Sequence, residues 1–258
     1  MERIKSYFII GASSDVGCAF LRSLEEKLSW TDSSAGNQGM TTVSVIAHFG
    51  TNRAVLDALS QECPHLQLIP IGCDLGSRAE VERLLDEAAA YGTPDCILYL
   101  AAGKLEYQKL KKLDYDKMDR DMEIQVHALA RVGARFLPEM AKNRFGKLVV
   151  MLSECTLGMP PRFMTGYVMV KYAALGLMKS MAMEYADKNV NVNGLSPAMM
   201  ETKFLSQIDP RLIEMNMENN VKKRNATPEE IAEAIHFLTS KGSDYMNGVN
   251  LNVSGGNR

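Results

Sequence analysis

Three polar side chains in the second half of the chain have the types and the spacing of a proton-transfer site. Tyr167 and Lys171 are four residues apart, and Ser153 precedes Tyr167 by fourteen residues. Residues four apart on a helix share a face, so the phenol and the ammonium would point into the same space. A free phenol ionises near pH 10, and a neighbouring ammonium lowers that pKa by stabilising the phenolate. Ser153 would donate a hydrogen bond to an oxygen on which negative charge develops.

The spacing of Tyr167 and Lys171 is weak evidence by itself. Tyr107 and Lys111 repeat it, with no serine or strand arranged around them. The prediction of a catalytic site therefore depends on the combination with Ser153 and on the elements that position all three residues.

A turn near the beginning of the chain predicts a nucleotide-binding site. Gly11 directly follows an apolar run, and Gly17 lies where a helix is expected to begin. Glycines at a strand-to-helix turn let the backbone approach a pyrophosphate, which rests on the unsatisfied N–H groups of the helix N-terminus. The residues of this turn that we expect to bind a cofactor are Gly11, Ser13, Ser14, Val16 and Gly17.

Residues that follow two later strands are further candidates for the cofactor site. Asp74, which precedes Leu75, would either hydrogen-bond an adenine amino group or serve as a turn residue before a helix, and both interpretations stay open. Ala101, Ala102 and Gly103 offer small side chains where a cofactor would press close to the chain.

The segment after the second expected strand bears on the choice between NAD and NADP. NAD sites usually place a carboxylate there to bind the ribose hydroxyls, whereas NADP sites accept a cation. Residues 47–53 contain no acid, and Arg53 would either meet a 2′-phosphate or be a solvated helix residue. The segment favours NADP, with NAD as the alternative.

Short apolar runs alternate with longer segments of helical periodicity along the chain. This alternation predicts a parallel sheet covered on both faces, and right-handed crossovers make it a doubly wound α/β fold with ligands at the carboxyl ends of the strands. We see no domain boundary and predict a single seven-stranded domain over residues 1–258. The expected strands are 7–10, 43–47, 66–71, 96–100, 147–152, 190–195 and 249–253, and the expected helices are 16–28, 53–61, 78–90, 118–142, 166–186 and 228–240.

Two segments interrupt the alternation. Residues 29–40 are polar and rich in Gly and Ser, which predicts a surface loop. Residues 198–226 separate the sixth strand from the last long helix, and a long insertion at this edge predicts a substrate lid. The methionines of this insertion would suit either an adaptable apolar pocket or the packing of a short helix; they are Met199, Met200, Met215 and Met217.

The bulk composition limits the kinds of partner. The chain has 258 residues and a net charge of −2, and it contains no block of Lys and Arg. We therefore expect neither nucleic acid nor an anionic membrane as the main partner. No stretch approaches the ~20 apolar residues of a membrane span, and the first apolar run is too short for a signal peptide.

Cysteine and histidine usage gives no sign of a disulfide framework or a metal site. The five cysteines include no C-x-x-C pair, and the four histidines show no ligand spacing. We therefore predict reduced thiols in a cytoplasmic protein and no catalytic metal.

Taken together, these residues resemble the single-domain short-chain dehydrogenase/reductase family over essentially the whole chain. The resemblance implies that Tyr167 donates its proton to a substrate carbonyl, that Lys171 also holds the ribose, and that Ser153 binds the carbonyl oxygen. Pro197 and Thr202 would contact the nicotinamide carboxamide. The matching positions occur in the family's order: the turn from Gly11 to Gly17, Asp74, Ala102-Gly103, Ser153, Tyr167 with Lys171, Asn193-x-x-x-Pro197, Thr202 and the closing segment 248–256.

Several positions depart from the family pattern. Asp15 replaces the middle glycine of the first turn; a carboxylate pointed inward would repel a pyrophosphate, and one turned to solvent would suit a helix N-terminus. Ala101 replaces the usual Asn after the fourth strand, and Ala198 replaces a glycine. Gln125 stands where the family pattern places the Asn of a proton relay, and its longer side chain alters the relay geometry.

The resemblance implies an NADP-dependent oxidoreductase that acts on a ketone or a secondary alcohol. A 3-oxoacyl thioester is one substrate class, and a sugar, a polyol or another ketone is equally open. An acidic carrier protein would meet Lys142, Arg144 and Lys147, which would otherwise complement a helix C-terminus. A homo-oligomer, either a tetramer or a dimer, would form through the two long helices.

Two other functions compete with this reading. One is an NADP-binding sensor or scaffold that has lost catalysis, which Asp15, Ala101 and Gln125 support. The other is an enoyl-thioester reductase, whose family pattern resembles Y-x6-K and would require a tyrosine at Met164.

Overall fold

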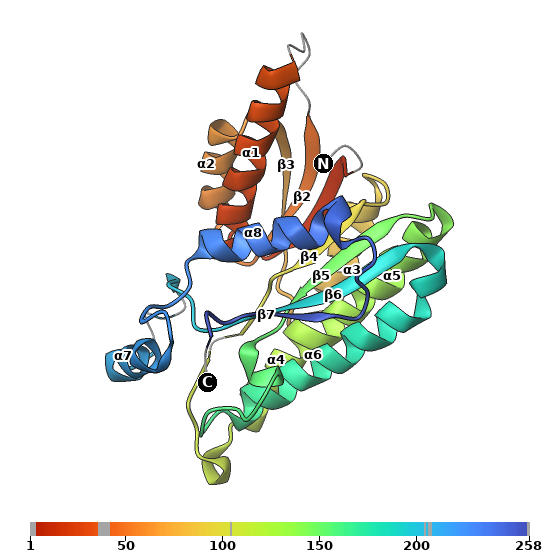
Figure 1. The fold of residues 1–258 in the computed structure, drawn as a ribbon. Coiled ribbons are helices and arrows are strands. Elements are labelled where there is room, and N and C mark those ends of the chain that lie inside the picture. Colours follow the sequence, from red (N-terminus) through yellow and green to blue (C-terminus); the bar gives the residue numbers. More distant parts are fainter. Residues whose placement is uncertain (1–3, 36–41, 104, 204, 206–207, 257–258) are drawn as a thin grey trace.

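Seven parallel strands form the centre of the protein, in the order β3-β2-β1-β4-β5-β6-β7 (Figure 1). This is a computed structural model, and it describes residues 4–35, 42–103, 105–203, 205 and 208–256. The predicted doubly wound α/β fold with a seven-stranded parallel sheet is confirmed. The strands are β1 Ser6–Ile10, β2 Val43–Phe49, β3 Leu66–Gly72, β4 Cys96–Tyr99, β5 Gly146–Met151, β6 Val190–Pro197 and β7 Asn250–Val253.

Helices cover both faces of this sheet (Figure 1). The helices α1 Asp15–Ala35, α2 Arg53–Glu62 and α8 Pro228–Thr239 pack on one face. The helices α3 Arg78–Ala89, α5 Ala128–Lys142 and α6 Thr165–Glu184 pack on the other. The helices α4 Tyr115–Met122 and α7 Pro210–Asn219 lie toward the carboxyl ends of the strands.

The apolar strands are explained by burial on two sides. Successive side chains of a strand point to opposite faces of the sheet. Tyr7 and Ile9 of β1 accordingly join the core under α1 and α8, whereas Phe8 and Ile10 join the core under α3, α5 and α6. Because both faces are covered, polar residues have no place in the middle of β1.

The strand order reverses next to β1. This strand pairs with β2 on one side and with β4 on the other, so the chain winds away from it in both directions. A crevice forms at such a point outside the carboxyl ends of the strands, and it is the usual ligand site of the fold. The turns that follow β1, β4, β5 and β6 therefore meet at one edge.

The loop predicted for residues 29–40 is wrong for its first part. Helix α1 continues through Ala35, and residues 36–40 lie outside the described residues. Polar side chains support the added turn: the Thr31 hydroxyl donates to the Lys27 carbonyl at 2.8 Å, and the Ser29 hydroxyl contacts Glu25 at 3.4 Å. Ser and Thr side chains that bond to the preceding turn are compatible with a helix, although their composition alone favours a loop.

The long helix predicted over residues 118–142 is interrupted. It begins earlier, as α4, where the Asp114 side chain caps the helix by accepting from the Lys117 N–H at 2.9 Å. A π-helical turn, η2 (Glu123–His127), then separates α4 from α5. Such turns insert a residue without changing the apolar pattern much, and they are frequent at functional sites.

The insertion 198–226 contains α7, which sequence periodicity did not reveal. Asp209 accepts from the Arg211 N–H at 2.9 Å, and Pro210 occupies the first helical turn. A parallel bridge between Met200 and Ala226 joins the ends of the insertion. Residues 204, 206 and 207 of the predicted lid lie outside the described residues.

No helix in the part of the chain that the structure describes is long and apolar enough to cross a membrane. Within the same residues, no group of His, Cys, Asp and Glu is arranged to hold a metal ion.

Candidate active site

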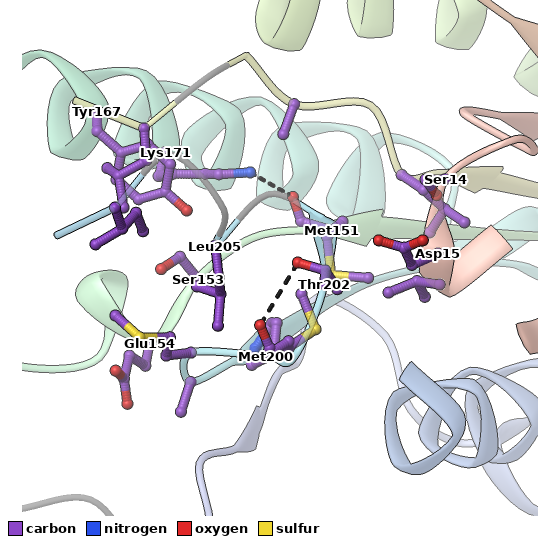
Figure 2. A pocket seen from close by; sticks show the side chains of 18 of the residues that line it. Ser14, Asp15, Met151, Ser153, Glu154, Tyr167, Lys171, Met200, Thr202 and Leu205 are labelled. Atoms are coloured by element: carbon purple, nitrogen blue, oxygen red, sulfur yellow. Dashed lines mark hydrogen bonds between the residues drawn. The ribbon is translucent and has the colours of Figure 1, made fainter. Parts of the chain in front are cut away.

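A cavity of about 450 Å³ opens at the carboxyl ends of β1, β4, β5 and β6 (Figure 2). It brings together residues that are far apart in the sequence. The predicted site residues that line it are Ser13, Ser14, Val16, Ala102, Ser153, Tyr167, Lys171, Pro197 and Thr202.

Helix α6 presents Tyr167 and Lys171 to this cavity from one face (Figure 2). The Lys171 ammonium lies 5.7 Å from the centre of the Tyr167 ring and donates to the Met151 carbonyl at 3.0 Å. Lys171 is 2% exposed, and burial lowers the pKa of its ammonium to about 8. An ammonium has three N–H donors, and Met151 uses one of them. The other N–H donors of Lys171 are therefore left for a ligand that binds in the cavity.

The Tyr167 phenol does not have the lowered pKa that the sequence analysis expects. Burial raises its pKa above the ordinary value, and a hydrogen bond with Ser153 opposes the rise. The nearby Lys171 ammonium, which donates to the Met151 carbonyl, does not offset this rise. At neutral pH the phenol therefore keeps its proton, which is the form that a proton donor needs.

Ser153 lies just beyond β5, at the start of the short 3-10 turn η3 (Glu154–Thr156). Its backbone is extended, and its hydroxyl oxygen accepts from the Cys155 N–H at 3.4 Å. The hydroxyls of Ser153 and Tyr167 point toward the same part of the cavity (Figure 2). An oxygen placed between them would accept a hydrogen bond from each.

Gln125 is buried in the π-helical turn η2, which packs against α6. Its side chain is 3% exposed, and neither Oε1 nor Nε2 has a hydrogen-bond partner within the described residues. An unpaired buried amide is rare and marks a position where a water or a ligand atom completes the hydrogen bonds. Gln125, the predicted relay residue, therefore lies beside the helix that carries Tyr167 and Lys171, and its amide atoms are available for a further hydrogen bond.

Two positions of the first turn have no room for a side chain. Gly11 has a φ of +86°, which favours glycine, and a Cβ there would lie 3.2 Å from the Ala101 nitrogen. A Cβ on Gly17 would lie 2.5 Å from the Ala12 oxygen. The Ser14 hydroxyl accepts from the Gly17 N–H at 3.1 Å and caps α1.

His48 supports this turn and was missed by the sequence analysis. Its Nδ1 accepts from the Gly11 N–H at 3.1 Å, and its Nε2 lies 3.0 Å from the Cys73 carbonyl. Burial lowers the pKa of the imidazole, so the ring is neutral at pH 7 and carries its proton on Nε2. The strand register places His48 beside this turn, because it pairs with Ile10, the residue before Gly11.

Asp15 takes the inward of the two orientations considered from the sequence, and the insertion after β6 supplies a partner for it. Its carboxylate lines the cavity at the N-terminus of α1 and accepts from the Lys203 N–H at 2.7 Å. Asp15 therefore ties the first turn to the insertion that follows β6.

Seven of the predicted cofactor residues are not among the described residues that line the cavity: Gly11, Gly17, Arg53, Asp74, Leu75, Ala101 and Gly103. Both carboxylate oxygens of Asp74 lie 3.0 Å from Arg120, and hydrogen bonds from Gly76 and Arg120 lower the pKa of that carboxyl. Leu75 is buried in the core under α3. Arg53 is exposed at the start of α2, with its Nε 3.4 Å from Asp57. Asp74 and Arg53 are both exposed, so the cofactor contact predicted for each stays a prediction.

The small residues after β4 are fixed by packing. Ala101 lies against Gly11, and a Cβ on Gly103 would overlap the Asp121 carboxylate of α4. Ala102 alone of the three lines the cavity.

The cations suggested for carrier docking are at the opposite end of the sheet. Lys147 is buried at the amino end of β5, where its ammonium bonds the Ser240 carbonyl at 2.7 Å and the Asp244 carboxylate at 2.8 Å. Lys142 and Arg144 precede this strand, whereas Ser153 follows it. A strand of six residues spans roughly 20 Å, so these cations lie far from the cavity. Lys147 is therefore a structural residue and is not available to a carrier protein.

The open side of the cavity is formed by residues that the sequence analysis did not single out. They come from the segments after β4, β5 and β6, and local patterns give no signal for side chains that meet only through the fold. Met199 and Met200 line the cavity, as one interpretation of the methionines predicts, and Met215 is exposed on α7. The newly identified lining residues are Leu105, Tyr107, Glu154, Pro161, Met164, Leu205 and Ile208.

Comparison with protein families gives a match over most of the chain. A family model described as "Enoyl-(Acyl carrier protein) reductase" matches residues 34–258. The bovine protein "Dehydrogenase/reductase SDR family member 4" is 32% identical over 187 residues, which cover 71% of this chain and 67% of the relative. The "7alpha-hydroxysteroid dehydrogenase" of Escherichia coli K12 is 31% identical over 188 residues, which cover 71% of this chain and 72% of the relative.

Solved structures agree on the fold. A 3-oxoacyl-[acyl-carrier protein] reductase from Brucella melitensis, with NAD bound, superposes with a TM-score of 0.82 at 20% identity, over 98% of this chain and 90% of that one. A 3-oxoacyl (acyl-carrier-protein) reductase from Agrobacterium tumefaciens, with NADP bound, gives a TM-score of 0.84 at 22% identity, over 98% and 93%. The chain therefore belongs to the short-chain dehydrogenase/reductase family and is an NAD(P)-dependent oxidoreductase.

Proposed function

We propose that this protein uses NADP to transfer hydride between the nicotinamide and a ketone or secondary alcohol. The observation that carries the proposal is the meeting of Ser153, Tyr167 and Lys171 in one cavity, which continues to the turn after β1. A proton donor and a phosphate-binding turn in the same cavity are what a carbonyl reduction by a dinucleotide requires.

The direct test is a reduction assay with four carbonyl probes, which we refer to as the ketone panel. The panel contains ethyl acetoacetate, cyclohexanone, 9,10-phenanthrenequinone and the acetoacetyl thioester of N-acetylcysteamine. We expect loss of NADPH absorbance and formation of the alcohol with at least one of them. No turnover with any probe, together with tight NADPH binding, would favour the sensor or scaffold instead.

The residues fit a dinucleotide on two observations. The turn around Gly11 and Gly17 leaves no room for side chains, and the buried Lys171 ammonium has donors to spare for ribose hydroxyls. Asp74, Leu75 and Arg53 would contact the adenosine end, beyond the cavity described above. The full set that we propose to bind the cofactor is Gly11, Ser13, Ser14, Val16, Gly17, Arg53, Asp74, Leu75, Ala101, Ala102, Gly103, Tyr167, Lys171, Pro197 and Thr202.

The bound cofactor supplies or accepts the hydride, and the side chains of this chain handle the proton and the developing charge. In the reducing direction, Tyr167 donates its phenolic proton to the substrate oxygen, and its raised pKa keeps that proton in place at neutral pH. Ser153 donates a second hydrogen bond to the same oxygen and stabilises the charge that develops there. Lys171 holds the ribose and lies close enough to favour the phenolate once the proton has left.

Gln125 is proposed as the inner end of the proton relay. Its amide is buried and unpaired within the described residues, so it would hold a water between itself and Lys171. Such a water would return a proton toward Tyr167 after each turnover.

The substrate end of the cavity favours an apolar carbonyl compound. Leu105, Met164, Leu205 and Ile208 line it, and segment 198–226 is proposed as the lid that closes over the substrate. The relatives act, by their names, on steroids and on 3-oxoacyl groups held by a carrier. A 3-oxoacyl thioester and an alicyclic ketone are both in keeping with this lining, which is why the panel contains one of each.

The choice of NADP predicts a measurable preference. NADPH is expected to bind at least about tenfold more tightly than NADH, because segment 47–53 offers Arg53 to a 2′-phosphate and no acid to repel it. Arg53→Gln should reduce that preference severalfold, whereas Arg78→Gln, which alters the first residue of α3 in the same way, should leave it unchanged. Nicotinamide fluorescence titrations measure both constants. Equal binding of NADH and NADPH by the unaltered protein would establish NAD as an equal cofactor.

Removing the charge of Asp15 is expected to increase the affinity for NADPH. Asp15→Asn keeps an oxygen for the Lys203 N–H but removes a negative charge beside the phosphate turn, so NADPH binding should tighten by roughly three- to tenfold at low salt. The gain should shrink in 0.5 M salt, where charges are screened. The exposed Asp187→Asn serves as the control, and weaker binding by Asp15→Asn would show that the charge supports the turn instead.

The enoyl-thioester reductase remains the weaker alternative. The description of the matching family model favours it. The residue that would have to be tyrosine is Met164, a buried thioether 6% exposed that has no proton to give. A panel extended with crotonyl thioester separates the two reactions.

We also propose a cytoplasmic homo-oligomer, a tetramer or a dimer. All five cysteines are buried and free, as expected for a reducing compartment. Helix α6 exposes Met169, Tyr172 and Met183, which an interface between copies would cover.

A further inference from the structure

A connected set of partly buried hydrogen bonds lies behind Ser153. The Thr156 hydroxyl donates to the Ser153 carbonyl at 2.8 Å, and the Asn250 amide nitrogen donates to the Thr156 hydroxyl oxygen at 2.9 Å. The Ser196 hydroxyl donates to the Asn250 amide oxygen at 2.6 Å. Thr156 is 8% exposed and Ser196 is fully buried. Three segments that are distant in the sequence, η3, β6 and β7, are joined at this point.

The number of protons on each hydroxyl fixes which group donates in every hydrogen bond of the set. A hydroxyl has one proton, so Thr156 spends its proton on the Ser153 carbonyl and Ser196 spends its proton on Asn250. The remaining contact, 3.3 Å between the two hydroxyl oxygens, then carries no proton. The Asn250 amide accepts from Ser196 and donates to Thr156, and it holds the Thr156 hydroxyl in the orientation that faces Ser153.

This set controls the turn that carries the Ser153 hydroxyl. The Ser153 carbonyl accepts both the Thr156 hydroxyl and the Thr156 N–H, the latter at 3.0 Å. With the carbonyl held twice, the Cys155 N–H is placed against the Ser153 hydroxyl oxygen, whose own proton is left for a substrate. Loss of the Thr156 hydroxyl would leave a single bond to close the turn.

None of the three residues touches the reacting atoms. Among the described residues that line the cavity, Ser153 and Glu154 belong to this turn, and Thr156, Ser196 and Asn250 are absent. Their effect on a reaction must therefore pass through Ser153. A burial role alone would not explain why polar groups occupy this interior position, because unpaired polar groups are costly there and apolar residues of the same shape are not.

We propose that Asn250 and Ser196, acting through Thr156, are positioning residues that aim the Ser153 hydroxyl at the substrate oxygen. The inference rests on the proposed carbonyl reduction, because it assigns the direction in which the Ser153 proton must point. It means that Asn250, a residue of the last strand, helps to orient a group ninety-seven positions earlier in the chain.

The experiment compares Thr156→Val with Thr156→Ser on the ketone panel. Val keeps the shape and removes the hydroxyl, so kcat should fall about tenfold or more, short of the loss caused by removing an oxyanion donor outright. KM and the NADPH dissociation constant should stay within about twofold, since neither ligand contacts Thr156. Ser restores the hydroxyl and should recover most of kcat. Asn250→Leu should reproduce the Thr156→Val result.

A matched control separates positioning from packing. Thr239 is a buried threonine of α8, 5% exposed, whose hydroxyl also donates to backbone carbonyls, and it is remote from the cavity. Thr239→Val should lose comparable thermal stability without the loss of kcat. Equal kcat losses in the two valine variants would overturn the proposal.

A double variant tests whether Thr156 acts only through Ser153. If Thr156 acts only through the Ser153 hydroxyl, adding Thr156→Val to Ser153→Ala should slow the enzyme no further. Multiplying losses in the double variant would overturn the proposal, because Thr156 would then act by another route.

Amide hydrogen exchange tests whether this turn is ordered, and it does so independently of catalysis. The Cys155 and Thr156 amides should exchange slowly in the unaltered protein and in Thr156→Ser, and at least about tenfold faster in Thr156→Val. A protein that shows this pattern but reduces no member of the panel would retain the positioned turn and lose the proposed reaction. Fast exchange at both amides in the unaltered protein would overturn the positioning itself.

Discussion

Replacing Tyr167 by Phe should lower the turnover of every reactive member of the ketone panel by about a thousandfold, within the range for removal of a general acid. The phenolic proton is the one that the substrate oxygen receives, and Phe keeps the ring while removing it. NADPH binding should change by less than about threefold, because Lys171, the residue proposed to hold the ribose, stays in place against Met151. Stopped-flow or steady-state loss of NADPH absorbance measures the first quantity, and fluorescence titration measures the second.

The control for this variant is Tyr107→Phe. Tyr107 also lines the cavity and also precedes a lysine by four residues, but it lies in a loop, and Lys111 lies in the separate 3-10 turn η1 (Leu110–Lys112). We expect a change in kcat of less than about threefold for Tyr107→Phe. Turnover that survives Tyr167→Phe, or a loss of similar size in both variants, would contradict the assignment of the proton donor.

The affinity for NADPH should weaken as the pH rises through about 8. Burial lowers the pKa of Lys171 to about 8, so the ammonium that binds the ribose hydroxyls is charged below that pH and neutral above it. The affected window begins at about pH 8, the pKa of Lys171 in the free protein, and extends to the higher pKa that this ammonium would have beside bound NADPH. Titrations at half-unit intervals from pH 6.5 to 9.5 should show a dissociation constant that is flat at first and then rises.

Two variants of Lys171 test the origin of this pH dependence. Lys171→Met should weaken NADPH binding at pH 7 by about tenfold or more, since hydrogen bonds to a charged group are lost, and it should abolish the rise above pH 8. Lys171→Arg should also remove the rise because the guanidinium stays charged, although its planar fork cannot reproduce the contact with Met151. A flat profile in the unaltered protein, or an unchanged rise in Lys171→Met, would assign the pH dependence to another group.

The fold was predictable because burial dictates the pattern of the strands. Each apolar run is a strand of a sheet that is covered on both faces, so alternation of strand and helix was sufficient to give the architecture. The misassigned positions have local causes. Ser29 and Thr31 extend α1 through side-chain bonds to the preceding turn, and the π-helical turn η2 adds a residue without disturbing the apolar stripe.

The meeting of the proposed catalytic residues in one cavity was predictable from the sequence, whereas the contacts of Asp74 and Arg53 within the chain were not. Ser153, Tyr167 and Lys171 lie at fixed positions relative to β5 and α6, so their spacing translates directly into a shared cavity. Asp74 and Arg53 are surface charges, and their positions depend on partners that the local sequence does not reveal, Arg120 and Asp57.

Ionisation and burial were also beyond the reach of sequence patterns. The pKa of Tyr167 was expected to fall beside a lysine, but burial of the phenol raises it. Lys147 looked like a surface cation and is buried, since Asp244, nearly a hundred residues later, arrives to pair with it. Such long-range pairs carry no signature in one sequence.

The most direct test of hydride transfer in this cavity uses NADPH that carries deuterium at both C4 positions. Mass spectrometry of the alcohol formed from a member of the ketone panel should show one deuterium on the former carbonyl carbon. The same label should be nearly absent from reactions with Tyr167→Phe over the same time. Tight binding of the labelled NADPH with no deuterium in any product would contradict the account and identify the protein as a cofactor-binding sensor or scaffold.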